Sequence, residues 1–128
     1  MVTSTTYYSI GVADPVTHFQ ILSKDPGNSA EFYSKLFGWS VAAPDAIGYR
    51  AVQTGSTEGI QGGIWQAPPQ AGSFVQLFVS VNDVSAAATQ AKDLGAKVLV
   101  PPMKLPGGDE MAVLLDPLGM SFAIVRRA

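Results

Sequence analysis

The feature that most constrains the fold is an internal repeat of one structural pattern. Asp25 and Asp83 each begin a stretch with the apolar spacing of an amphipathic helix, and Gly38 and Gly95 each end it. Aspartate accepts hydrogen bonds from the free N–H groups of a first helical turn, and glycine readily adopts the conformation that ends a helix. A strand pattern precedes each helix and three follow it. Each half therefore has the order βαβββ.

Residue alternation and helical spacing predict the bounds of these elements. The expected strands are 16–22, 39–41, 49–53, 60–65, 74–81, 97–100, 110–115 and 121–125. The first helix should begin at Pro26, and the second should begin after Asn82 or Asp83. Pro101 and Pro102 are expected to end the strand that starts at Lys97. The predicted buried stripes are Ala30, Tyr33, Leu36 and Phe37 in the first helix, and Val84, Ala87, Ala88, Ala91 and Leu94 in the second.

The repeat also predicts the domain organisation. We interpret residues 1–13 as an N-terminal tail, 14–66 as the first module, 67–72 as a linker rich in proline and glycine, and 73–128 as the second module. A single module is too small to bury its own sheet face. The two modules are thus expected to form one α+β domain, a cupped mixed sheet with both helices on its outer face. His18 and Gln76, each seven residues before the helix-capping aspartate, would point into the cup.

Composition excludes several classes of protein. Only 14% of the 128 residues are charged, the net charge is −2 and no basic run occurs, so nucleic-acid binding is not expected. No apolar stretch approaches the roughly 18–20 residues of a membrane span. The absence of cysteine removes disulfides, thiolate catalysis and cysteine zinc sites. The N-terminal residues do not resemble a secretory signal, so a cytoplasmic location is the default expectation.

An ordered set of motifs accompanies the repeat. The motifs are His18-Phe-Gln-Ile21, Glu31-Phe-Tyr33, Leu36-Phe-Gly-Trp39, Val81-Asn-Asp83, Leu94-Gly-Ala-Lys-Val98 and Asp116-Pro-Leu-Gly119. In this order and spacing, over about residues 14–127, the chain is similar to the vicinal oxygen chelate superfamily. That group contains the glyoxalases, the bleomycin-resistance proteins and the extradiol dioxygenases. The resemblance implies that paired βαβββ modules surround a concave site.

The resemblance also implies where a catalytic metal would be held. Members with metal chemistry take a His, Gln or Glu from the first strand of each half, and a carboxylate or His from the last strand. The matching positions here are His18, Gln76, Ala123 and either Gln61 or Gly63. A divalent ion in an apolar cup needs basic or charge-compensating ligands, and these positions offer no carboxylate. We therefore expect no metal cofactor, with His18 and Gln76 as the remaining metal candidates.

Two carboxylates lie close in sequence to the inner-face strands. Glu58 falls in a predicted turn. Glu110 shares a strand face with Ala112 and Leu114, opposite Met111. Neither residue is expected to complete a metal site.

The resemblance and the alternation together predict a ligand-binding surface. Its candidate residues are His18, Gln76, Gln61, Trp65, Phe78, Trp39 and Met111. Each has a structural alternative: His18 and Gln76 as internally hydrogen-bonded polar groups, and Trp39 and the other large side chains as core.

Three functional hypotheses follow. The first is a metal-free protein that binds a small, partly apolar or aromatic molecule. The second is a metal-dependent lyase, isomerase or dioxygenase using His18, and the third is an accessory dimer without a ligand. Because relatives of this size commonly pair, a homodimer is expected under all three.

Overall fold

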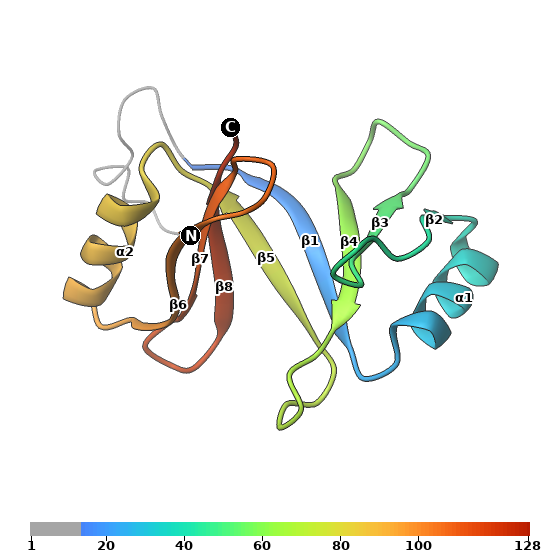
Figure 1. Cartoon of the computed structure of the whole chain (residues 1–128), viewed down its shortest axis with the longest axis horizontal. Coiled ribbons are helices and arrows are strands. Elements are labelled where there is room, and N and C mark those ends of the chain that lie inside the picture. Colours follow the sequence, from blue (N-terminus) through green and yellow to red (C-terminus); the bar gives the residue numbers. More distant parts are fainter. Residues whose placement is uncertain (1–13) are drawn as a thin grey trace, which may run out of the picture.

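The chain forms one continuous sheet flanked by two helices. The computed structural model describes residues 14–128, so the predicted tail, residues 1–13, lies outside the described part. The elements, labelled in Figure 1, are β1 (Val16–Ser23), α1 (Pro26–Phe37), β2 (Ser40–Val41), β3 (Arg50–Gln53), β4 (Gln61–Gln66), β5 (Phe74–Ser80), α2 (Val84–Asp93), β6 (Lys97–Lys104), β7 (Glu110–Leu115) and β8 (Ser121–Arg126).

The order of the strands confirms the predicted α+β architecture of two βαβββ modules. The eight strands follow the order β2-β3-β4-β1-β5-β8-β7-β6. Within the modules, β1 runs parallel to β4 and β5 runs parallel to β8. The modules join where β1 pairs with β5 in the antiparallel direction. The result is a single mixed, cupped sheet (Figure 1).

Both helices pack on the same, outer face of the sheet, and each covers its own core. Under α1, the buried residues are Ala30, Val52 and Ile64. Under α2, they are Val81, Val84, Ala88, Ala112, Leu114 and Ile124. Figure 1 shows the two helices at opposite flanks of the molecule, so the inner face carries no helix. Within residues 14–128, neither helix is long and apolar enough to cross a bilayer.

The ends of α1 follow the predicted capping chemistry. The Asp25 carboxylate accepts a hydrogen bond from the backbone N–H of Asn28 at 3.1 Å, and Pro26 stands in the first turn. At the other end, Gly38 has a φ of 75°, and its N–H donates to the carbonyl of Ser34 at 2.9 Å. This left-handed residue turns the chain from α1 into β2.

The predicted helix stripes are wrong at their C-terminal ends. Leu36 is 59% exposed, Phe37 is 57% exposed and Leu94 is 72% exposed. Leu94 is the C-cap of α2, so it no longer follows the face that packs on the sheet. The last turn of α1 lies over β2, which has only two residues and offers little surface for Leu36 to pack against.

The predicted end of the sixth strand is also wrong, because β6 continues through Pro101 and Pro102 to Lys104. Proline cannot donate a ladder hydrogen bond, but an edge strand has one side without a partner. Here β6 is at the edge of the sheet and pairs only with β7. The register shifts between Val100 and Met103, and the two prolines fall within this irregularity.

Substitution of one buried leucine tests this core. Leu114→Ala should lower the free energy of unfolding by about 2–5 kcal/mol, because it removes methyl groups from a fully buried site. Leu118→Ala is the matched control: Leu118 is 95% exposed and should change stability by less than about 0.5 kcal/mol. Urea unfolding followed by circular dichroism measures both. Similar losses in the two variants would contradict the described core.

Candidate ligand-binding site

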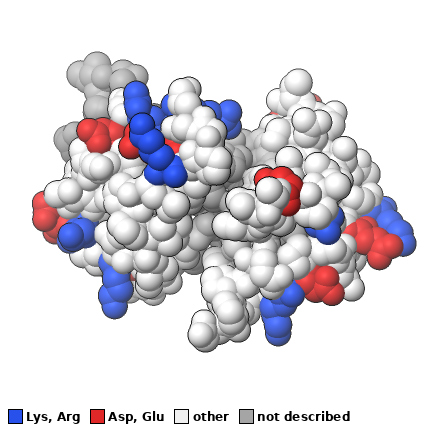
Figure 2. Space-filling model, viewed as in Figure 1, with Lys and Arg blue, Asp and Glu red and all other residues white. Residues whose placement is uncertain are grey.

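The inner face of the sheet contains a cavity with a volume of about 410 Å³. Figure 2 shows that this face of the molecule is hollowed between the two halves. The cavity is lined by Thr17, His18, Tyr49, Gly59, Ile60, Gln61, Gly62 and Arg127. It lies toward the beginning of β1 and β4, beside the line where the modules meet.

His18 on β1 lines this cavity. It is paired with Gln61 on β4 and with Phe78 on β5. Its ring lies 4.2 Å from the ring of Phe78, measured between centroids, at an angle of 41°. The ladder is irregular between Val16 and His18, and Thr17 also borders the cavity, with its Oγ1 3.1 Å from His18 Nδ1. Thr17 and His18, which are adjacent in β1, therefore both line the cavity.

The surroundings of His18 favour its neutral form. Burial lowers the pKa of the imidazole below its usual 6.5, and the positive charge of Arg127 lowers it further. The negative charge of Asp109 opposes this effect in part. At neutral pH, the ring therefore retains one nitrogen that can accept a hydrogen bond.

Tyr49 lies over Gly63 on the inner face. A Cβ on Gly63 would overlap the phenol ring of Tyr49, and a Cβ on Gly62 would overlap the ring of Phe19 on the outer face. The tandem glycines thus let an aromatic ring approach the backbone from each side of the sheet. The ring of Tyr49 also meets that of Trp65 edge to face, with centroids 6.4 Å apart.

A tight turn before β3 positions Tyr49. The Asp45 carboxylate accepts hydrogen bonds from the N–H groups of Ile47 at 3.0 Å and Tyr49 at 2.9 Å. Gly48 supplies the left-handed conformation that this turn needs, with a φ of 85°. Burial raises the pKa of the Tyr49 phenol, and the charge of Asp45 raises it further. The hydroxyl therefore remains a hydrogen-bond donor at neutral pH.

Of the two glutamines predicted for the site, Gln61 lines the cavity and Gln76 does not, and the amides of both are used internally. Gln61 Oε1 accepts from the N–H of Thr54 at 2.5 Å, and its Nε2 donates to the carbonyl of Ser56 at 3.2 Å. These bonds close the β3–β4 hairpin. Gln76 is 6% exposed, and its Nε2 donates to Ser121 Oγ at 2.7 Å.

The predicted apolar residues separate into different regions. Phe78 is buried with Ala123 and Val125, and Met111 packs against this cluster on the inner face. Trp65 sits beside Tyr49 and donates its Nε1 hydrogen to the carbonyl of Ile47 at 2.8 Å. None of these three residues lines the cavity: Phe78 lies beside His18 across the β1–β5 pair, Met111 lies in the second module and Trp65 in the first.

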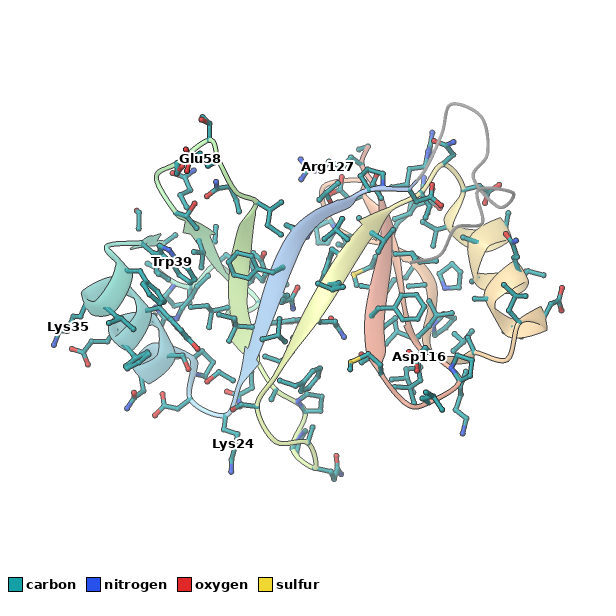
Figure 3. The ribbon with its side chains drawn as sticks, turned by 180° about the vertical axis from the view of Figure 1, so that it is seen from behind. Lys24, Lys35, Trp39, Glu58, Asp116 and Arg127 are labelled. Carbon is teal, nitrogen blue, oxygen red and sulfur yellow. The ribbon has the colours of Figure 1, made fainter. Side chains whose placement is uncertain are left out.

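Trp39 is not brought to the cavity. It packs under α1 on the outer face, with its ring 5.7 Å from that of Phe19 and 5.4 Å from that of Tyr33. Figure 3 labels it beside that helix. The reason is local: Gly38 ends α1 and turns the following residue beneath the helix.

The two nearby glutamates lie apart from the cavity. Glu58 is exposed in the β3–β4 hairpin, where Figure 3 shows it at the tip of the loop. Glu110 pairs with Arg126, with 3.4 Å between Oε1 and Nη1. Its neighbours Ala112 and Leu114 face α2, whereas Met111 faces the cup.

The register defines the four positions at which related proteins would hold a metal. Gln20 pairs with Gly63 and Phe78 pairs with Ala123, so the repeat makes Gly63 the counterpart of Ala123. Those two residues carry no donor atom, and the Gln76 amide nitrogen already donates to Ser121. Within residues 14–128, no group of three His, Cys, Asp or Glu side chains could hold a metal ion. The side chains present do not fit a divalent cation.

Paired βαβββ modules around a concave site define the vicinal oxygen chelate fold. Residues 18–125 match the family model of the glyoxalase-like domain, and the chain belongs to this family. It is 27% identical over 135 residues to the anthracycline biosynthesis protein DauV of a Streptomyces strain (C5), covering 85% of the chain and 46% of that protein. It is 28% identical over 113 residues to the putative glyoxylase CFP32 of Mycobacterium bovis, covering 85% and 42%. The chain thus spans less than half of either relative.

Solved structures agree with this fold. Methylmalonyl-CoA epimerase from Streptomyces coelicolor superposes with a TM-score of 0.62 at 21% identity, covering 88% of this chain and 96% of that one. The epimerase from Mycobacterium tuberculosis also gives 0.62, at 17% identity, covering 88% and 87%. At such low identity, the likeness establishes the fold alone.

Only His18 and Gln61 of the predicted site residues line the cavity. Six lining residues were absent from the sequence prediction: Thr17, Tyr49, Gly59, Ile60, Gly62 and Arg127. Arg127 could have been found, because alternation along β8 continues from Ala123 through Val125 to this residue. Tyr49 and Thr17 depend on the turn before β3 and on the irregular start of β1, which alternation does not predict.

The environment of His18 makes stability depend on pH. Because its pKa is lower in the folded state, the unfolded chain binds the proton more readily, and stability falls as pH decreases through about 6.5. The loss should stop once the pH is below the folded pKa. Subtracting the curve of His18→Gln isolates this contribution, since the other titrating groups remain. An NMR titration of this single histidine checks the pKa directly, and a value of 6.5 or higher would contradict the described burial.

The contact between Tyr49 and Gly63 has a stability consequence. Gly63→Ala should lower the free energy of unfolding by about 1–3 kcal/mol, because the new methyl group displaces the phenol ring. Gly72→Ala is the control, since no atom lies within 4 Å of a Cβ there. Urea unfolding and the near-ultraviolet circular dichroism of Tyr49 and Trp65 report the change. Equal spectra and stabilities for the two variants would show that the ring does not lie over Gly63.

Proposed function

We propose that the cup binds a small, partly apolar or aromatic organic molecule and does so without a catalytic metal. The observation that carries the proposal is the His18 ring, which lines the cavity and packs at a tilt against the buried ring of Phe78. Aromatic rings pack well against such surfaces in offset or tilted arrangements. A volume of about 410 Å³ lies within the usual range of small-molecule sites.

The donor set supports the metal-free part of the proposal. Of the four positions used for metals in the superfamily, only His18 offers a strong ligand. The Gln76 amide is hydrogen-bonded internally, and Gly63 and Ala123 have no donor atoms. The name of one relative, which refers to anthracycline biosynthesis, also favours a small organic ligand.

A neutral aromatic probe tests the binding function. The probe 2-naphthamide should bind saturably with one molecule per chain, measured by calorimetry and by the fluorescence of Trp65 near the cavity. Ile60→Asp should weaken binding about tenfold, because it places a polar group where apolar surface would be buried. Leu118→Asp, at a site 95% exposed and outside the cavity, should leave binding unchanged. Absence of saturable binding would contradict the proposal and favour the ligand-free alternative.

The metal content of the protein tests the metal-free reading. Protein purified without chelator and without an affinity metal should contain no stoichiometric divalent metal, and added ions should not raise its thermal stability. His18→Ala serves as the comparison. Stoichiometric zinc, nickel, manganese or iron that disappears in this variant would contradict the proposal and favour a metal-dependent lyase, isomerase or dioxygenase. Homodimerisation and a cytoplasmic location stay predictions from the sequence.

A further inference from the structure

We propose that the ligand is an organic anion whose carboxylate, or a group of similar charge and shape, is bound by Arg127. Its apolar part then lies against the His18 ring, which is backed by the buried ring of Phe78. The inference rests on the proposed binding function and specifies the chemistry of its ligand.

Arg127 is the one charged side chain among the residues that line the described cavity. Ala123 and Val125 face the cup in the cluster around Phe78, and alternation carries Arg127 to the same face just beyond the end of β8. Figure 3 labels Arg127 near the upper end of the two central strands. Arg127 and His18 both line the cavity, and the positive charge of Arg127 lowers the pKa of His18.

The preceding residue, Arg126, provides a comparison, because its charge is paired with a carboxylate of the same chain. Arg126 pairs with Glu110 across β7 and β8 at 3.4 Å. In the part of the chain covering residues 14–128, no such ion pair engages Arg127. The carboxylate of Asp109 also influences His18, but it does not line the cavity, and its Oδ1 accepts the N–H of Ala128 at 2.9 Å. The positive charge at the cavity therefore remains available to a ligand.

The other polar groups of the cavity are compatible with an anion. The hydroxyls of Thr17 and Tyr49 can each donate a hydrogen bond, and both residues line the cavity. A guanidinium binds a carboxylate through two parallel N–H···O bonds, which fix its position as well as its charge. A cationic ligand would meet Arg127 without a compensating carboxylate among the lining residues.

Two probes that share the same rings but differ in charge test whether Arg127 binds an anionic group. The native protein should bind 2-naphthoate about tenfold more tightly than 2-naphthamide, because only the carboxylate forms charge-assisted bonds with the guanidinium. In Arg127→Gln the two probes should bind about equally, whereas Arg127→Lys should retain part of the preference. Arg126→Gln is the matched control and should keep the native preference. Added salt should reduce the preference in the native protein.

The possible outcomes distinguish a failure of the anion inference from a failure of the proposed binding function. If both probes bind equally to the native protein, or if Arg127→Gln keeps the preference, the anion inference is overturned while the binding function stands. If neither probe binds, the proposed function itself fails. Arg127 is exposed, so its replacement leaves the core intact, and far-ultraviolet circular dichroism verifies the fold of each variant.

Discussion

The antiparallel pairing of β1 with β5 is the interaction on which the rest of the structure depends. Each module has one face under its helix, and neither could form a concave surface alone. The pairing sets His18 beside Phe78 and Gln20 beside Gln76, so side chains from both modules meet at one line. On the outer side of the same line, Phe19 lies beside Leu77. The cup is therefore a consequence of how the repeat joins, and its chemistry follows from the few side chains at the junction.

Much of the fold could be predicted because the repeat combines signals that agree with one another. Asp25, Pro26 and Gly38 specify a helix by capping, and the alternation of β1 assigns His18 and Phe19 to opposite faces. The same alternation placed Phe78 and Met111 on the inner face. It also predicted that His18 faces the cup, and His18 lines the cavity. These features depend on the spacing of residues that are close together in the chain, so they can be predicted from a single sequence.

The remaining features depend on contacts between distant segments. Trp39 is an aromatic residue beside a glycine, and only the packing of α1 decides that it joins Phe19 under the helix. The amide of Gln61 faces the cavity, yet the hairpin that it closes is visible only once Thr54 and Ser56 are in place. Pro101 fits a strand because that strand is at an edge, which is a property of the whole sheet. Alternation in the sequence predicts which face of the sheet a side chain occupies, but it does not predict which residues that side chain contacts.

The tandem glycines of β4, Gly62 and Gly63, have no side chains on either face of the sheet beside the candidate site. At Gly62 and Gly63 the backbone is the only partition between Phe19, which belongs to the core under α1, and Tyr49, which belongs to the cup. A shift of either ring is thus transmitted across a single layer of peptide groups. Natural or engineered variation in the core beneath α1 should consequently alter the shape of the cup, although that core lies on the opposite face of the sheet. If the cup binds a ligand as proposed, its selectivity depends also on the packing under α1.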